Sequence, residues 1–215
     1  MSELRLDVYT SPLRDLDNGG QFSPTTSTLV YGPTESVLVD TQYMADDVDE
    51  VIRRIEATRT TLTAIYVTHA HADHYFGLER LLERFPTARA VAAAVVADEI
   101  AAGNDTIRAD WATMFSGAAL DNTAIPEPLD GDTLAIDGEV LRAIVVGQAD
   151  IPNNTVVHIP SIARGRRRRR RLQRHQPLPR CVRPRRLAPL AGEPRQGRRA
   201  RATHRRRRPQ APGAA

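Results

Sequence analysis

The stretch Thr68–Gly77, which reads THAHADHYFG, decides how the rest of the chain is interpreted. Within six residues it places four side chains of the kinds that bind metal ions, namely His69, His71, Asp73 and His74. Neutral imidazoles and carboxylates suit zinc and similar divalent ions. The stretch follows the apolar run Leu62–Val67, which predicts a strand that ends in a turn. The first two histidines can then face one ion, and the last two side chains can reach a second. A lone histidine is usually a core or surface residue, but this spacing predicts metal binding.

The pattern H-x-H-x-D-H, followed by an aromatic residue and Gly77, resembles the motif of the metallo-β-lactamase-fold hydrolases. The resemblance extends from about Leu4 to Ile162. It implies an α/β (α+β) fold in which two sheets pack as an αββα sandwich, with metal ions at one edge of the sheets. It also implies a hydrolase that uses one or two zinc ions, or another divalent ion. The metal would activate water to attack an ester, amide or thioester bond of a small-molecule substrate.

The same resemblance implies a role for each residue of the motif. His69 and His71 would hold the first ion. Asp73 and His74 would belong to the second site, and Asp73 would also be the catalytic residue that orients the attacking water. Asp40, at the end of a predicted strand, would accept hydrogen bonds from the metal loop and hold its shape. The alternative for Asp40 is a turn residue with no role in the site.

The chain departs from the family pattern at the third ligand position. Family members carry a Gly-His pair after the strand that here ends at Val146, whereas this chain has Gly147–Gln148. Gln148 would then take the third place beside the two histidines, as a neutral and weaker ligand through its amide oxygen. Asp150 is open to two interpretations, as a contributing ligand or as a turn residue near Pro152.

Hydrophobic periodicity predicts repeated strand and helix units, as in an α/β sandwich. The predicted strands are Leu4–Tyr9, Thr28–Tyr31, Val37–Val39, Thr63–Val67, Ala90–Ala93, Thr133–Ile136, Val140–Val146 and Thr155–Ile159. The predicted helices are Ala45–Ala57, Phe76–Phe85, Val95–Ala102 and Thr106–Ser116. We expect Gly103–Asn104 to separate the last two helices. We expect a hairpin turn at Asp137–Gly138 and a turn-rich link at Glu127–Asp132. Trp111 is predicted to pack in the core, with contact to substrate as the alternative.

The charge of the chain divides it into two unlike segments near Ala163. Residues 1–163 carry 10 Arg against 25 Asp or Glu, a formal charge of −15, whereas residues 164–215 carry 20 Arg against one Glu, a charge of +19. The second segment is rich in Arg and Pro and has no apolar period, so it cannot offset the entropy cost of ordering. We therefore predict a truncated metallo-β-lactamase-like domain at 1–162, with an incomplete second half, and a disordered tail at 163–215.

The Arg-rich segment has two interpretations. In the first it is a frame-shifted translation. Read one base later, codons compatible with Arg167–Gln176 can encode A-G-D-V-V-Y-N-G-I-N, and those compatible with His204–Gln210 can encode T-V-V-A-G-H-K. These readings resemble the family's next strand with its bridging Asp, and its last metal loop with a final His. In the second interpretation the segment is a natural polycation that binds nucleic acid non-specifically. It has no nucleic-acid-binding fold motif, which favours the frame shift.

Composition restricts the remaining choices of class and compartment. With Cys181 as its single cysteine, the chain can form neither an internal disulfide nor a cysteine metal cluster. No apolar run approaches the roughly 20 residues needed to span a membrane, and the first ten residues lack a signal-peptide pattern, so we expect a cytoplasmic location. The expected function is a zinc-dependent hydrolase with impaired activity. The alternative is an inactive remnant or a basic protein that binds nucleic acid through its tail.

Overall fold

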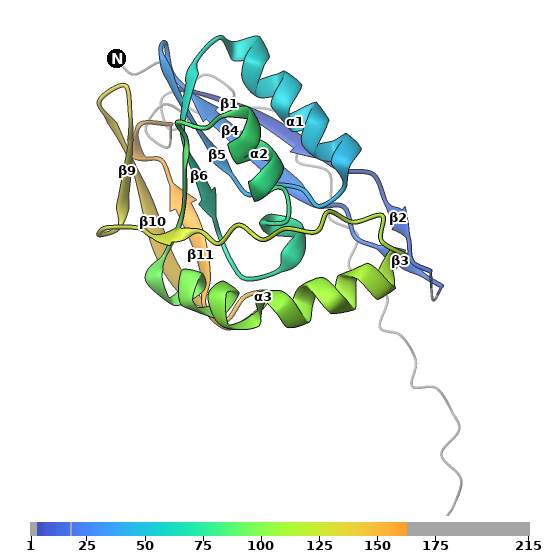
Figure 1. The fold of residues 1–215 in the computed structure, drawn as a ribbon. Helices are drawn as coiled ribbons and strands as arrows, with labels where there is room; N and C mark the ends of the chain where they lie inside the picture. Colours follow the sequence, from blue (N-terminus) through green and yellow to red (C-terminus); the bar gives the residue numbers. More distant parts are fainter. Residues whose placement is uncertain (1–3, 18, 163–215) are drawn as a thin grey trace, which may run out of the picture. The chain divides into compact units, whose positions relative to one another are not determined.

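The computed structural model describes residues 4–17 and 19–162. The predicted tail at 163–215, with its expected disorder and its frame-shift interpretation, lies outside the described residues. The described part of the chain contains two main β-sheets, a short hairpin and three α-helices (Figure 1). Among its helices, none combines the length and the continuous apolar character that a membrane crossing requires.

The first sheet positions the motif that the sequence singles out. Its strands are β1 (Arg5–Thr10), β4 (Thr26–Tyr31), β5 (Glu35–Val39), β6 (Thr61–Val67), β7 (Arg89–Ala92) and β8 (Glu127–Pro128), and they lie in that spatial order. The pairs β1–β4 and β4–β5 are antiparallel, whereas β5–β6, β6–β7 and β7–β8 are parallel. The carboxyl ends of the parallel strands meet at one edge of the sheet, where ligands bind in open α/β sheets. The loops that follow β5 and β6 therefore lie next to each other.

The remaining elements flank this sheet. The second sheet is antiparallel, in the order β11-β10-β9, and consists of β9 (Thr133–Ile136), β10 (Glu139–Gly147) and β11 (Asn154–His158). The short strands β2 (Arg14–Asp15) and β3 (Gln21–Phe22) pair as a hairpin. The helices are α1 (Ala45–Thr58), α2 (Leu78–Arg84) and α3 (Ala94–Met114), with a 3-10 turn at Ala72–His74.

Strand β6 shows how the layers are built, because both of its faces are buried. Ile65 and Val67 belong to the larger core, which the three helices complete. Ala64 and Tyr66 point the other way into a smaller core, which Ile136 of β9 and Leu141 of β10 complete. Alternate side chains of a strand point to opposite faces, so helices cover one face of the first sheet and the second sheet covers the other. The result is an α–β–β arrangement (Figure 1).

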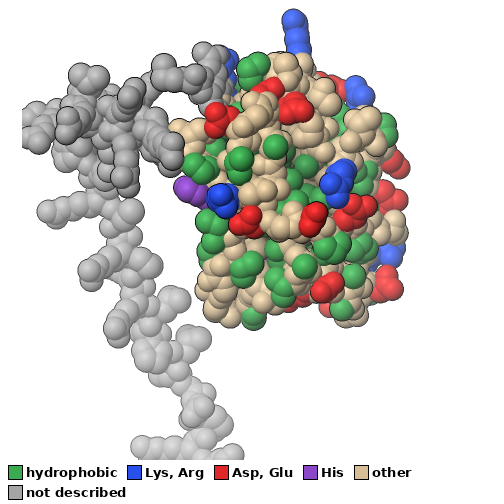
Figure 2. Space-filling model, turned by 90° about the vertical axis from the view of Figure 1, so that its left-hand side faces the viewer, with side chains coloured by type: hydrophobic (Ala, Val, Ile, Leu, Met, Phe, Trp, Pro, Cys, Tyr) green, Lys and Arg blue, Asp and Glu red, His purple; other side chains and the backbone are tan. Residues whose placement is uncertain are grey.

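The outer face of the second sheet is not covered by any described element. The apolar side chains of Val140, Ile144, Val146 and Val156 are exposed there. Figure 2, which views the molecule from the side of this sheet, shows hydrophobic side chains interspersed with charged ones. An αββα sandwich would have a second helical layer on this face. The predicted α/β class is therefore confirmed, whereas the incomplete second half stays a prediction.

Most predicted elements lie within two residues of the observed ones, but the helix pair after Ala93 was predicted wrongly. Residues 94–114 form one continuous helix, and Gly103–Asn104 lies inside it. Asn104 is buried; its side chain accepts a hydrogen bond from the Tyr75 hydroxyl (3.1 Å) and donates one to the carbonyl of Asn122 (3.1 Å). These tertiary contacts override the weak helix propensity of both residues. The link at 127–132 was also partly wrong, because its first two residues form β8.

Candidate metal centre

Asp40 holds the start of the motif in place. It directly follows β5 and has a positive φ of 60°, which turns its side chain towards the neighbouring end of β6. Its carboxylate accepts hydrogen bonds from the backbone N–H of Thr68 (2.8 Å) and from the Thr68 hydroxyl (2.8 Å). Its own N–H donates to the carbonyl of Tyr66 (2.8 Å). Asp40 therefore joins two adjacent strand ends and determines the path of the chain into His69.

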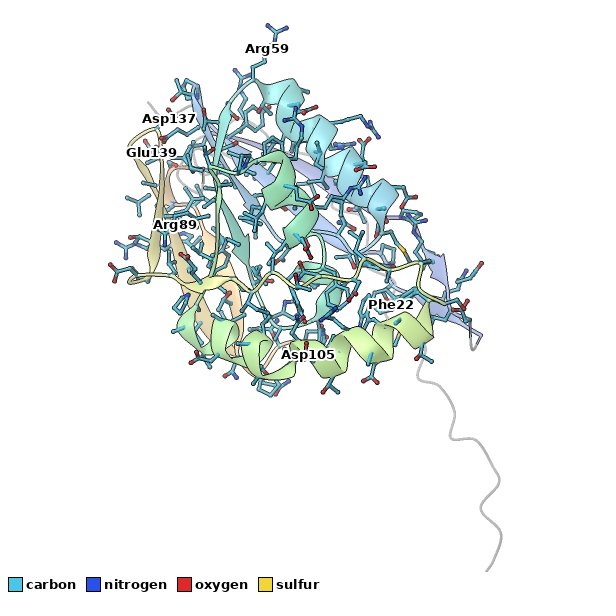
Figure 3. All side chains as sticks on the ribbon, viewed as in Figure 1. Phe22, Arg59, Arg89, Asp105, Asp137 and Glu139 are labelled. Carbon is cyan, nitrogen blue, oxygen red and sulfur yellow. The ribbon has the colours of Figure 1, made fainter. Side chains whose placement is uncertain are left out.

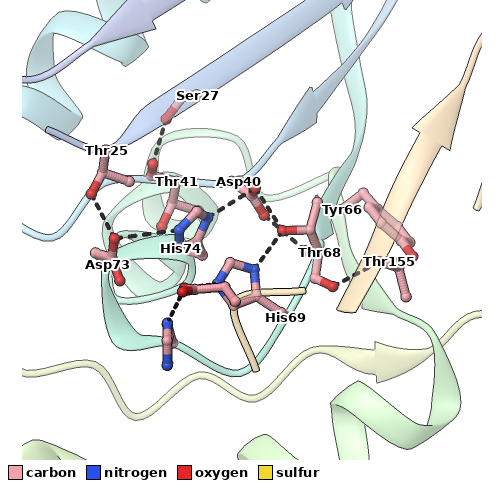
Figure 4. Close-up of polar contacts among 12 residues, drawn as sticks. Thr25, Ser27, Asp40, Thr41, Tyr66, Thr68, His69, Asp73, His74 and Thr155 are labelled. Carbon is pink, nitrogen blue, oxygen red and sulfur yellow. Dashed lines mark hydrogen bonds and ion pairs between the residues drawn. The ribbon is translucent and has the colours of Figure 1, made fainter. Parts of the chain in front are cut away.

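The second half of the motif forms a chain of charged contacts (Figure 4). His74 lies between two carboxylates, with Nδ1 2.9 Å from Asp40 Oδ2 and Nε2 3.3 Å from Asp73 Oδ2. Asp73 Oδ2 also accepts a hydrogen bond from the Thr25 hydroxyl (2.6 Å). Asp73 and His74 are largely buried, so each depends on these partners for the stabilisation that water would otherwise supply.

These contacts set the protonation of the motif. Burial alone would lower the pKa of His74, but the charges and hydrogen bonds of Asp40 and Asp73 raise that pKa to about 10. Burial would raise the pKa of Asp73, but hydrogen bonds and charge from His74, with a hydrogen bond from Thr25, hold it below its usual value. Burial and the charge of His74 lower the pKa of His69. His69 is therefore a neutral imidazole, which is the form that binds metal.

Three side chains bring their donor atoms together beside this chain of contacts. Nδ1 of His71 lies 2.8 Å from Asp150 Oδ2, and Nε2 of His69 lies 3.5 Å from the same oxygen. One donor atom from each of these residues lies within 4.8 Å of the others. In the part of the chain that the structure describes, no other three His, Cys, Asp or Glu residues meet this condition.

The donor set fits a divalent metal ion. Nδ1 of His69 lies 2.9 Å from the Thr68 hydroxyl, which leaves Nε2 to face the group. This Nε2 atom is buried and has no hydrogen-bond partner among the described residues. A buried polar atom without a partner is costly, and a cation at this position would satisfy it. Two imidazoles and a carboxylate are a ligand set that zinc accepts.

Asp150 is the third member of this group, and Gln148 as a ligand stays a prediction. Gln148 is exposed in the turn between β10 and β11 and is not among the residues that line the cavity described below. The second predicted pair, Asp73 and His74, lies together, but no third donor completes a group around them among the described residues. Asp150 was considered from the sequence, but nothing there favoured it over Gln148.

The loop that carries Asp150 is attached to the motif by β11. Thr155 donates to the carbonyl of Thr68 through its N–H (3.0 Å) and through its hydroxyl (2.7 Å). The hydroxyl of Tyr66 donates to Thr155 Oγ1 (2.9 Å). Within the loop, Asn154 Oδ1 accepts a hydrogen bond from the N–H of Ile151 (2.9 Å). The residues that make this attachment visible in the sequence are the polar pair Asn154–Thr155, directly after the turn. Hydrophobic periodicity alone does not distinguish this pair from other polar residues.

A cavity of about 700 Å³ opens beside the donor group. One side is formed by the motif and Asp150, and another by residues 21–26, which include β3. The third side is the C-terminal half of α3, with Ile107, Trp111 and Met114. Figure 3 shows Phe22 beside this half of the helix. Trp111 packs in the core, as predicted, and it also lines the cavity; contact with substrate stays a prediction.

Comparison with known proteins decides the family. Residues 20–167 match the sequence profile of the metallo-beta-lactamase superfamily. The chain belongs to this superfamily. The family predicted from the motif is thus confirmed. The superfamily is metal-dependent, in agreement with the His and Asp group at the edge of the first sheet.

Individual relatives agree with this assignment. A hydroxyacylglutathione hydrolase from Synechococcus sp. is 44% identical over 54 residues, which are 25% of this chain and 21% of that protein. A metallo-beta-lactamase structure from Pontibacter korlensis has a TM-score of 0.55 at 19% identity, covering 75% of this chain and 68% of that one. The metallo-beta-lactamase FIM-1 from Pseudomonas aeruginosa, in its mono-zinc form, has a TM-score of 0.50 at 19% identity, covering 73% and 61%. At these identities the solved structures show the fold alone.

Proposed function

We propose that this superfamily member is a zinc-dependent hydrolase that cleaves an ester, amide or thioester bond of a small molecule. The observation that carries the proposal is the convergence of His69, His71 and Asp150 around the unpartnered Nε2 of His69, beside a cavity large enough for a small substrate. The hydroxyacylglutathione hydrolase among the relatives supports a thioester or ester, and the mono-zinc form of FIM-1 supports zinc as the metal.

The residues of the site have distinct roles in this proposal. His69, His71 and Asp150 hold the ion, which when bound acts as a Lewis acid that activates water and polarises the scissile carbonyl. Asp73 lines the cavity, and its lowered pKa keeps it ionised at neutral pH. It can accept a hydrogen bond from the attacking water and orient it. Asp40 keeps the loop in shape through Thr68, so it acts on position and not on substrate.

We also propose that the activity of this chain is impaired. Asp73 and His74 lack a third donor among the described residues, so a second ion would be held weakly there. The bridging Asp and final His expected for the family do not occur as such in the sequence after Ile162. A frame shift near codon 163 accounts for both absences. The nucleotide sequence around codons 160–166 tests this directly, since a one-base correction must restore the two motifs.

The metal assignment is tested by comparing Asp150→Asn with Gln148→Ala. We expect Asp150→Asn to lower zinc affinity by at least about tenfold, because it removes an anionic donor from the group. Gln148→Ala serves as the matched control in the same turn and should leave zinc affinity unchanged. Zinc affinity is measured by competition with a chromophoric chelator, and zinc content by elemental analysis after dialysis. Loss of zinc in Gln148→Ala alone would return the third place to Gln148.

The reaction is tested with a panel that contains an aryl ester, a thioester and a β-lactam, each with zinc and with chelator. We expect slow hydrolysis of at least one substrate that depends on zinc. His69→Ala should abolish both zinc binding and hydrolysis, because it removes the buried donor at the centre of the group. Hydrolysis that persists in chelator or in His69→Ala would contradict the proposed mechanism.

A further inference from the structure

Thr25 lies where the β2–β3 hairpin joins the first sheet. The hairpin, which forms one wall of the cavity, lies in the chain between Ser11 and Thr25, and β4 begins directly after Thr25. The N–H of Ser11 donates to the Thr25 carbonyl (2.9 Å), and the N–H of Thr25 donates to Ser11 Oγ (2.9 Å). Both residues are buried. These two hydrogen bonds therefore hold the ends of the hairpin segment together.

The side chain of Thr25 makes a separate contact with the metal motif. Its hydroxyl donates to Asp73 Oδ2 (2.6 Å), as Figure 4 shows. Nε2 of His74 lies 3.3 Å from the same oxygen. Because both contacts use Oδ2, they fix the rotation of the carboxylate and leave Oδ1 as the oxygen that can contact a water molecule in the cavity. Hydrogen bonds to a carboxylate are stronger than those between neutral groups, so this contact is well suited to hold one orientation.

Gln42 holds the backbone of Thr25 in place independently of this hydroxyl. Gln42 is completely buried, and its Nε2 donates to the Thr25 carbonyl (3.1 Å) and to Ser27 Oγ (2.8 Å). Its Oε1 is buried without a hydrogen-bond partner among the described residues, so the contacts of Nε2 alone orient the amide. The backbone of Thr25 is thus held by Ser11 and Gln42, and the hydroxyl contacts Asp73.

The hairpin itself is attached at points away from Thr25. The guanidinium of Arg14 in β2 lies 2.6 Å from the carboxylate of Asp47 in α1. The ring of Phe22 in β3 packs edge-on against Trp111 of α3, with 5.2 Å between their centroids. Both strands of the hairpin therefore pack on helices of the larger core, and Thr25 is the residue through which this packed unit contacts Asp73.

We propose that Thr25 is a positioning residue that connects the β2–β3 hairpin to the carboxylate of Asp73. Its hydroxyl keeps Oδ1 of Asp73 turned towards the cavity, and Asp73 in turn holds the hairpin beside the metal motif. The inference rests on the proposed hydrolase function only for the role of Asp73 in orienting water. The connection itself is a property of the folded chain, so it can be measured without metal or substrate.

Hydrogen exchange of the full-length protein in chelator measures this connection. Thr25→Val removes the hydroxyl but keeps the shape of the side chain and both hydrogen bonds to Ser11. We expect the hairpin amides to exchange at least about tenfold faster in this variant, whereas the amides of β6 change less. Thr25→Ser keeps the hydroxyl and should restore the slow exchange. Unchanged exchange of the hairpin in Thr25→Val, or an equal increase in β6, would overturn the proposal.

Two comparisons assign the effect to the contact with Asp73. Thr63→Val is the matched control, because the Thr63 hydroxyl donates to the carbonyl of Ser36 (3.1 Å) in the same sheet and neither residue lines the cavity. It should leave the exchange of the hairpin unchanged. Asp73→Ala should speed this exchange, and adding Thr25→Val to Asp73→Ala should cause no further increase, because both changes remove the same contact. A further increase in the double variant would show that Thr25 acts without Asp73 and would refute the proposal.

Hydrolysis of an aryl ester by the zinc-loaded protein separates this proposal from the proposed function. Thr25→Val should lower kcat at least about tenfold with little change in KM, because Asp73 acts on the attacking water and not on substrate binding. The group of His69, His71 and Asp150 is untouched, so zinc affinity should not change. Thr63→Val should keep the original kcat. If the exchange results hold but the unaltered protein does not hydrolyse the ester, the proposed function fails and the connection stands. If Thr25→Val hydrolyses the ester with the original kcat, the positioning role fails and the proposed function stands.

Discussion

Replacing Asp40 by Asn tests whether this carboxylate holds the metal loop. Asn has the same shape and tolerates the positive φ of 60° at this position, so the change acts on charge and hydrogen bonding and not on the backbone. The carboxylate accepts two hydrogen bonds from Thr68 and faces Nδ1 of His74 at 2.9 Å. A hydrogen bond to a charged group contributes about 1.5–3 kcal/mol. We expect Asp40→Asn to lower the free energy of unfolding by about 2 kcal/mol, since one Thr68 bond is retained.

The matched control is Asp49→Asn on α1. Asp49 makes a two-pronged ion pair with Arg80 (2.7 and 2.8 Å), but both side chains are roughly half exposed. Exposed ion pairs contribute about 0.2–1 kcal/mol, so the same chemical change should cost less there. Urea unfolding in chelator, followed by far-UV circular dichroism, measures both variants. With zinc present, Asp40→Asn should also weaken metal binding by about 10–100-fold. If Asp40→Asn costs no more than Asp49→Asn, Asp40 does not hold the loop.

Two further matched pairs of variants test packing and the attachment of the Asp150 loop. Gly77→Ala should destabilise the chain by about 1–3 kcal/mol, because a Cβ there would lie 2.9 Å from the carbonyl oxygen of Gln42. Gly103→Ala should be neutral or stabilise the chain by up to about 1 kcal/mol, because its Cβ would meet only Ile107 at 3.5 Å and the residue lies inside α3. Urea unfolding measures the stability of both variants. An equal loss of stability in the two would contradict this prediction. Tyr66→Phe should lower zinc affinity, because it removes the hydroxyl that contacts Thr155. Tyr75→Phe loses an equally buried hydrogen bond, which goes to Asn104 and not to Thr155, and should leave zinc affinity unchanged, so equal zinc titrations would disprove the attachment.

The elements of the first sheet could be predicted because their signals are local. Strand β6 carries an apolar run, and α1 carries a buried stripe of Val48, Val51 and Ile55 at helical spacing. The turn at Asp137–Gly138 has positive φ at both residues (48° and 76°), which is the backbone that this residue pair favours in a hairpin. In each case the residues that decide the structure are neighbours in the sequence.

The failures have the opposite cause. Gly103–Asn104 ends a helix by local propensity, but Asn104 is held in α3 by Tyr75 and Asn122, which are 29 and 18 residues away. The same holds at the candidate metal centre. The motif shows that His69 and His71 lie close together, and their ring centroids are 5.0 Å apart. The choice between Gln148 and Asp150 depends on how the loop before β11 turns back to β6. That turn is set by contacts across the two sheets, which a single sequence does not display.

The attachment of Thr155 to Thr68 has a consequence for the order of events in folding. These residues are 87 positions apart, so their contact closes a long loop and carries a corresponding entropic cost. The histidines of the motif come from the first half of the chain, and Asp150 arrives only when β11 docks beside β6. A chain that has formed its first sheet but not yet docked the second therefore has only two of its three donors together. We expect zinc added during refolding to increase the rate of the late docking step only a little. It should decrease the rate of the reverse step by more, because the complete donor group exists only after docking.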